Sequence, residues 1–132
     1  MQITQKNFYK KFLGRAGEIK AIEFLKDKGL KILEKNHKTK LGEVDIICED
    51  KGIIVFVEVK TRTDSSFGFP SEAVDYKKRE KYFRLAREYM IKNKLYDKSC
   101  RFDVVEIENG QINHIENAFY RWKTLAKLIK IW

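Results

Sequence analysis

The hydrophobic and polar positions of this chain follow two different periods. Residues 7–28 carry Ala21, Ile22 and Leu25 on one helical face, and Gly29 follows as a residue that commonly ends a helix. Residues 53–57 are apolar without interruption and rich in β-branched side chains, which is typical of a buried central strand. The alternation of these periods predicts a chain of mixed helices and strands.

The central strand belongs to a hairpin whose turn fixes the pairing of its residues. The turn centres on Lys51 and Gly52, and a two-residue loop with Gly second is a favoured hairpin connection. If the loop has this even length, Asp45 lies opposite Glu58 on the same face of the sheet. Directly opposed residues have Cβ atoms about 4.5–5.5 Å apart. The register therefore predicts two neighbouring carboxylates.

The remaining pattern predicts one further helix between strands and another at the end of the chain. Asn109-Gly110 is a strong hairpin turn that joins the last two strands. We expect loops at residues 36–40 and 61–71. The expected elements are helices at 7–28, 72–92 and 119–132, and strands at 30–35, 42–48, 53–60, 101–108 and 111–115.

Length and composition favour one folded domain. The chain has 132 residues, 43% of them hydrophobic, with one proline and no linker or repeat. The longest apolar run, residues 53–57, is too short for a transmembrane helix, and the first residues lack the apolar core of a signal peptide. We therefore expect a cytoplasmic protein without a membrane span.

The charge balance favours a polyanionic partner. Lys plus Arg minus Asp plus Glu gives 28 − 19 = +9. A surplus of this size attracts nucleic acid through counterion release, although lysine-rich composition also serves solubility. Cys48 and Cys100 belong to no Cys/His cluster, so we expect buried hydrophobic side chains rather than a zinc site.

Charged residues interrupt the apolar pattern at three places. Glu58 and Lys60 interrupt the central strand, and Glu18 lies in the apolar stripe of the first helix. Buried charges are costly unless they are paired or bind a metal. One interpretation is an ordinary ion-pair cluster of Asp45 or Glu58 with Lys60 at the edge of the sheet. The other is a functional site that collects three acids and a lysine.

The second interpretation matches the needs of phosphodiester hydrolysis. Mg²⁺ prefers carboxylate oxygen, keeps several waters, and can activate a water while neutralising charge on phosphorus. Asp45 and Glu58 would hold Mg²⁺ or Mn²⁺, with the Val59 carbonyl as a third ligand. Glu18 would bind a second ion or reach the first through water. Lys60 would position or deprotonate the attacking water, or steady the phosphate, and we leave that choice open.

Further cations surround these positions in the sequence. Tyr82 and Leu85 belong to the apolar packing stripe of the helix at 72–92. Lys78 and Lys81 lie at the edge of this stripe, where they would face what the helix covers. Asp103 is a further polar candidate, for which a capping or ion-pair role is equally open. The candidate nucleic-acid contacts are Arg15, Lys38, Lys40, Arg62, Lys77, Lys78 and Lys81.

Seven separate segments of the chain, in order, carry a family resemblance: residues 14–18 (GRAGE), 42–45 (GEVD), 56–62 (FVEVKTR), 67–70 (FGFP), 72–74 (EAV), 101–105 (RFDVV) and 114–119 (HIENAF). Together they resemble the bacterial YraN-like family within the Asp…Glu-x-Lys nuclease superfamily. The resemblance implies a restriction-endonuclease-like α/β fold of the α+β type, with a central mixed sheet of about five strands flanked by helices, as in archaeal Holliday-junction resolvases. It implies metal-site roles for Glu18, Asp45, Glu58 and Lys60, but it supplies no established activity.

The sequence divides into a nuclease-like domain at residues 1–119 and a basic amphipathic helical extension at residues 120–132. The leading hypothesis is a Mg²⁺-dependent DNA endonuclease, selective for branched or single-stranded structure, that can form a homodimer. The alternative is a non-catalytic nucleic-acid-binding module that acts with DNA-processing machinery. A third idea is a partner-binding protein that uses the helix at residues 122–132.

Overall fold

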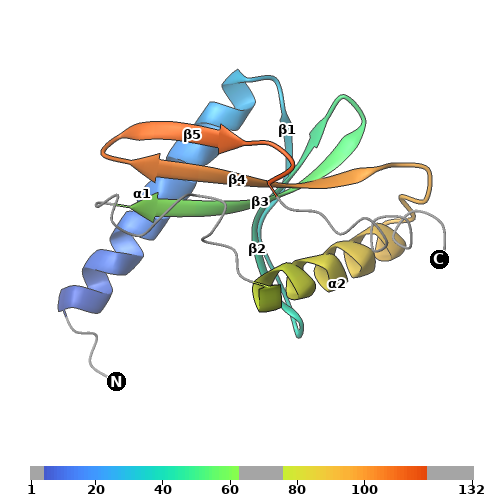
Figure 1. Cartoon of the computed structure of the whole chain (residues 1–132), viewed down its shortest axis with the longest axis horizontal. Coiled ribbons are helices and arrows are strands. Elements are labelled where there is room, and N and C mark those ends of the chain that lie inside the picture. Colours follow the sequence, from blue (N-terminus) through green and yellow to red (C-terminus); the bar gives the residue numbers. More distant parts are fainter. Residues whose placement is uncertain (1–4, 63–75, 119–132) are drawn as a thin grey trace.

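The computed structural model describes residues 5–62 and 76–118, with side chains from residue 13 and from residue 77 onward. The predicted terminal helix, the domain boundary at residue 119 and much of the predicted loop at 61–71 lie outside these residues. The elements are α1 (Gln5–Asp27), β1 (Lys31–Thr39), β2 (Gly42–Asp50), β3 (Ile53–Arg62), α2 (Tyr76–Lys92), β4 (Cys100–Glu108) and β5 (Gln111–Ile115), as shown in Figure 1.

The five strands form one mixed sheet in the order β1-β2-β3-β4-β5. β3 pairs antiparallel with β2 and parallel with β4, so it is the central strand that the apolar run at 53–57 predicts. A parallel pair needs a crossover connection, and α2 lies in the segment that joins β3 to β4. The predicted α+β fold with a five-stranded mixed sheet is confirmed.

Each face of the sheet is covered by its own apolar cluster. Phe56 of β3 packs in the cluster that contains the α2 residues, including Leu85. Val55 and Val57 point to the other face, where the α1 residue Leu25 is fully buried. Figure 1 shows α1 running along the sheet and α2 beside β2. Within the described ranges, neither helix has the length and apolar character that a membrane crossing needs.

The hairpin between β2 and β3 has the predicted register. Lys51 and Gly52 adopt φ values of 49° and 87°, which suit a two-residue hairpin turn of the favoured twist. The paired residues run from Asp50↔Ile53 to Ile46↔Val57. One further step in this register places Asp45 opposite Glu58, on the same face as Phe56.

Beyond this point β2 and β3 separate. β2 continues to Gly42 in pairing with β1, while β3 continues to Arg62 in pairing with β4. We call the opening between residues 42–45 of β2 and 58–62 of β3 the fork. At its base the Asp45 carboxylate accepts a hydrogen bond of 2.8 Å from the Val59 N–H. The Asp45 side chain therefore accepts the hydrogen bond of a β3 backbone N–H at the point where the pairing of β2 with β3 ends.

The prediction of a loop at residues 36–40 is wrong, because most of this segment belongs to a strand. β1 runs to Thr39, and its last pairs are His37↔Val44, Lys38↔Glu43 and Thr39↔Gly42. Because β2 has left β3 by this point, its pairing with β1 satisfies backbone groups that would otherwise lack a strand partner. Asn36 interrupts the strand with a φ of 50°, a left-handed conformation that Asn tolerates better than most residues.

Gly29 ends α1 as predicted. Its φ is 99°, and the Leu30 N–H donates to the Leu25 carbonyl at 2.9 Å. The Gly29 N–H donates to the Lys26 carbonyl at 2.9 Å, which completes a Schellman motif. α2 ends with the same pair of bonds, but there Lys94 occupies the left-handed position, with a φ of 54°.

Candidate functional site

The fork brings together all four residues that the sequence singles out for catalysis. Glu18 comes from α1, Asp45 from β2, and Glu58 with Lys60 from β3. These residues line one open hollow of about 420 Å³. The other residues that line it are Leu13, Gly14, Val59 and Thr61.

Gly17 allows α1 to come close enough to β3 for Glu18 to reach this hollow. A Cβ atom at position 17 would lie 2.1 Å from the Thr61 Oγ1, closer than side-chain atoms can approach. The absence of a side chain at position 17 therefore sets the distance between the helix and the strand. Glu18 follows directly and is half-buried beside the fork.

The carboxylates at the fork destabilise one another's charged forms. Burial raises the pKa of Asp45 to about 7, and the charges of Glu58 and Glu18 add to this shift, while the Val59 N–H opposes it. Burial also raises the pKa of Glu18, and the charges of Glu43 and Glu58 contribute in the same direction. Negative charge in the fork is therefore poorly compensated, which favours the binding of a cation.

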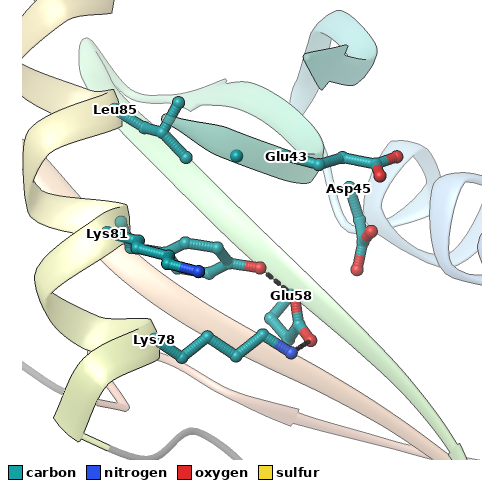
Figure 2. Close-up of a pocket in the computed structure, with 8 residues that line it drawn as sticks. Glu43, Asp45, Glu58, Lys78, Lys81 and Leu85 are labelled. Carbon is teal, nitrogen blue, oxygen red and sulfur yellow. Dashed lines mark hydrogen bonds and ion pairs between the residues drawn. The ribbon is translucent and has the colours of Figure 1, made fainter. Parts of the chain in front are cut away.

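Glu58 is the acid that the protein itself neutralises. Its residue is only 5% exposed, and both carboxylate oxygens are engaged. The Lys78 ammonium donates to Oε1 in an ion pair, and the Tyr82 hydroxyl donates to Oε2. Figure 2 shows both contacts as dashed lines that converge on Glu58 from α2. The cation that pairs with Glu58 thus comes from α2 and not from the neighbouring position 60.

A second hollow of about 280 Å³ lies on the α2 side of the same acid pair. Asp45 and Glu58 line both hollows, so the pair forms the wall between them. Figure 2 shows the Glu43 carboxylate pointing away from α2, while the Asp45 carboxylate points along the strands toward Glu58. The other residues that line the second hollow are Gly42, Glu43, Lys78, Lys81, Tyr82 and Leu85.

Sequence reasoning missed three residues of the site. Tyr82 looked like a packing residue, although it lies one helical turn after Lys78 and on the same face. Glu43 shares a face with Asp45 because the two are separated by one residue in a strand. Asn36, whose side chain hydrogen-bonds Glu18, could not be found because it was assigned to a loop.

The predicted nucleic-acid contacts divide into two groups. Arg62 and Lys78 face acids of the protein: the Arg62 side chain is 8% exposed and lies 3.8 Å from Glu106, and Lys78 pairs with Glu58. The rest present their cations to solvent. The exposed members are Arg15, Lys38, Lys40, Lys77 and Lys81.

The fit of a divalent metal rests on Asp45 and Glu58. Within the described residues, no group of three or more His, Cys, Asp or Glu side chains lies close enough to hold a metal ion. Mg²⁺ is commonly bound through one or two carboxylates and several waters, so a pair of acids suffices. Asp45 and Glu58 supply hard oxygen donors whose mutual repulsion a cation would relieve. The residues present therefore fit such an ion.

Asp103 belongs to a different cluster, on the opposite face of the sheet from Glu58, since it pairs with Val57 of β3, and it has the ion-pair role. It is fully buried and accepts hydrogen bonds from Arg101 at 3.1 Å, His114 at 2.7 Å and the Asn117 N–H at 2.9 Å. We call these four residues the Asp103 cluster. Cys48 and Cys100 are buried as expected.

The fold and site define a small α+β protein whose acid-rich centre lies where two strands of a mixed sheet diverge. The chain belongs to the YraN family, described as "Uncharacterised protein family UPF0102", whose pattern matches residues 17–107. The predicted family resemblance is confirmed.

Relatives in this family match most of the chain. A UPF0102 protein from Persephonella marina is 44% identical over 80% of this chain and 91% of its own length. One from Clostridioides difficile is 49% identical over 80% and 95%, respectively. One from Caldanaerobacter subterraneus is 46% identical over 86% and 99%. The similarity thus extends over nearly the whole of each relative.

Proposed function

We propose that this protein is a Mg²⁺-dependent nuclease that hydrolyses phosphodiester bonds in DNA. The observation that carries the proposal is the convergence of Glu18, Asp45, Glu58 and Lys60 on one hollow at the fork. The raised pKa of Asp45 supports the proposal, because strongly shifted pKa values are common among the residues of active sites.

Each residue has a role that follows from its position. Asp45 and Glu58 would hold the metal, which supplies an activated water and neutralises charge on the phosphate. Lys60 lies two residues beyond Glu58 and lines the same hollow, where its ammonium meets the scissile phosphate or the attacking water. Glu18 faces the hollow from α1 and orients water from that side. This division needs no further cofactor.

The charge of the protein supports nucleic acid as the substrate. The net charge is +9, and exposed cations such as Arg15 of α1, Lys40 of the β1–β2 turn and Lys81 of α2 lie on the segments around the fork. Such side chains contact phosphates and carry no sequence information, so we expect selection by DNA structure, branched or single-stranded. Binding should weaken steeply with salt because counterions are released.

The test is cleavage of labelled branched, single-stranded and duplex DNA with Mg²⁺ or Mn²⁺. Asp45→Asn should lower cleavage by about 10²–10³-fold or more while DNA binding is retained. Glu23→Gln, which changes an exposed acid of α1, is the matched control and should cleave normally. Cleavage that survives in both Asp45→Asn and Glu58→Gln contradicts the proposal.

One observation favours a second candidate, a DNA-binding module without catalysis. Both oxygens of Glu58 are already engaged by Lys78 and Tyr82, so this acid is neutralised without a metal. Salt-sensitive DNA binding with no cleavage across the substrate panel and both metals would favour this candidate over the nuclease.

A further inference from the structure

Glu58 lies between two opposite environments. On one side are the acids Asp45 and Glu18, whose pKa values its charge raises. On the other side is α2, whose Lys78 and Tyr82 each engage one of its oxygens. Of the two α2 partners, only the lysine carries a charge. The same carboxylate is therefore a candidate metal ligand and the acceptor of a protein cation.

These two uses of Glu58 conflict at its Oε1 atom. An ammonium and a divalent ion on one carboxylate repel each other strongly where solvent is scarce, and the Glu58 side chain is only 7% exposed. The Lys78 side chain is 36% exposed, and it lies on a flexible stem at the open hollow of about 280 Å³. Lys78 can therefore move toward solvent, whereas Glu58 cannot.

The Tyr82 hydroxyl creates no such conflict. It is neutral, its residue is 2% exposed, and its ring packs in the apolar cluster beneath α2. A buried donor held by packing keeps a carboxylate in one orientation, as outer-shell partners of metal ligands do in general. Tyr82 can thus remain bonded to Oε2 whichever cation occupies Oε1.

We propose that Lys78 is a resident counter-ion of Glu58 that a divalent cation displaces, and that Tyr82 is the positioning residue that orients Glu58 in both states. The proposal rests on the metal site of the proposed function. It also assigns the released Lys78 a place beside Lys81 in the second hollow, where both ammonium groups meet substrate phosphates. Metal binding would in this way supply a cation to the substrate.

Direct binding of Mn²⁺, measured by calorimetry on the full chain, tests the proposal without reference to cleavage. Lys78→Met removes the competitor, so it should tighten Mn²⁺ binding by about tenfold relative to the wild type. Tyr82→Phe removes the orienting hydroxyl and should weaken binding by about tenfold or more. The matched control is Lys81→Met, which removes the same charge from the same helix and hollow and should change affinity less than threefold.

The opposite signs expected for the two variants distinguish the proposal from simple structural damage, which would weaken binding in both. Equal affinities for Lys78→Met and Lys81→Met overturn the displacement, since they would show only a loss of positive charge. Weaker binding in Lys78→Met overturns it as well. Absence of Mn²⁺ binding by every protein overturns the metal site and the proposed function together, whereas equal binding by all four overturns this inference alone.

A spectroscopic measurement follows the displacement itself. The side-chain ammonium signal of Lys78 should shift or disappear by exchange with water when Mg²⁺ is added, and that of Lys81 should stay nearly unchanged. A Lys78 signal that is unaltered at saturating Mg²⁺ contradicts the proposal, even if the affinities follow the expected order.

Discussion

The sheet carries two buried acidic centres that differ in how their charge is balanced. Although burial alone would raise the pKa of Asp103, bonds from His114 and Arg101 and the Asn117 N–H lower it. Burial raises the pKa of Asp45 to about 7, and the charge of another acid, Glu58, adds to this shift. Both acids lie in strands of the same sheet, so the difference arises from their partners.

The contrast indicates what each centre is for. A carboxylate that receives several donors holds the structure together, and in the Asp103 cluster these donors tie Asn117, beyond β5, and His114 to β4. A carboxylate placed against other carboxylates weakens the folded state and is typical of a functional site. The fork therefore stores a repulsion that the Asp103 cluster lacks.

The largest expected effect is the loss of Asp103. Asp103→Asn removes a fully buried carboxylate that accepts bonds from Arg101, His114 and the Asn117 N–H. Although Arg101 keeps its ion pair with Asp50 at 2.9 Å, the free energy of unfolding should fall by about 3–5 kcal/mol at pH 7. Urea unfolding followed by circular dichroism measures this. Since the folded pKa of Asp103 lies below its ordinary value of 3.8, this stabilisation is present above that pH and is lost as the pH falls through the folded pKa. A loss below about 1 kcal/mol would contradict the structural role.

At the fork we expect the loss of an acid to raise the free energy of unfolding rather than lower it. Asp45→Asn removes a charge that the native state disfavours, so it should raise the free energy of unfolding by roughly 2–3 kcal/mol at pH 8 without metal. The folded pKa, about 7, lies above the ordinary value of 3.8. Between these values the unfolded chain releases a proton that the native state keeps, so the wild type loses stability as pH rises. The gain in the variant should grow from pH 4 to pH 7 and then level off; a gain that is independent of pH would refute the repulsion.

A smaller effect tests how α1 contributes to the fork. Gly17→Ala should lower the free energy of unfolding by about 1–2 kcal/mol, because its Cβ meets the Thr61 side chain. Gly14→Ala is the matched control, since a Cβ there meets no atom from other parts of the described chain within 4 Å, and it should stabilise the helix by about 0.5–1 kcal/mol. As Gly17→Ala moves Glu18 away, an NMR titration should also show a lower pKa for Asp45. An unchanged pKa would mean that Glu18 adds nothing to the repulsion.

The smallest effect lies outside both centres and serves as a reference. Lys94 ends α2 with a φ of 54°, a conformation that glycine adopts without steric cost. Lys94→Gly should raise the free energy of unfolding by about 0.5–1 kcal/mol at all pH values between 4 and 8. Thermal unfolding across this range measures the gain in stability. A gain that changes with pH would show that groups outside the two acidic centres are the main source of the pH dependence of stability.

The fold was predictable where local chemistry determines it. The Lys51-Gly52 turn fixed the register of the β2–β3 hairpin, and hence the opposition of Asp45 and Glu58, without any tertiary information. Asn109-Gly110 and Gly29 likewise marked the last hairpin and the end of α1. The end of β1 was not predictable, because residues 36–39 are polar and form a strand only after β2 turns away from β3.

The residues that line the site were predictable, but the partners of Glu58 were not. Glu18, Glu58 and Lys60 stood out because each placed a charge in an apolar pattern. Asp45 stood out because the hairpin register places it opposite Glu58. The partner of Glu58 depends on where α2 lies over the sheet, which no local pattern specifies. For that reason Lys78 was assigned to phosphate and Tyr82 to the core.

The two-residue turn between β2 and β3 also bears on the order of events in folding. Closing so short a loop costs little chain entropy, so Asp45 and Glu58 can meet as soon as the hairpin forms. α2 comes later in the sequence, and Lys78 reaches Glu58 only when this helix docks on the sheet. If the hairpin forms before α2 docks, the refolding chain holds two repelling carboxylates without their counter-ion, and added salt should speed this early, hairpin-forming phase.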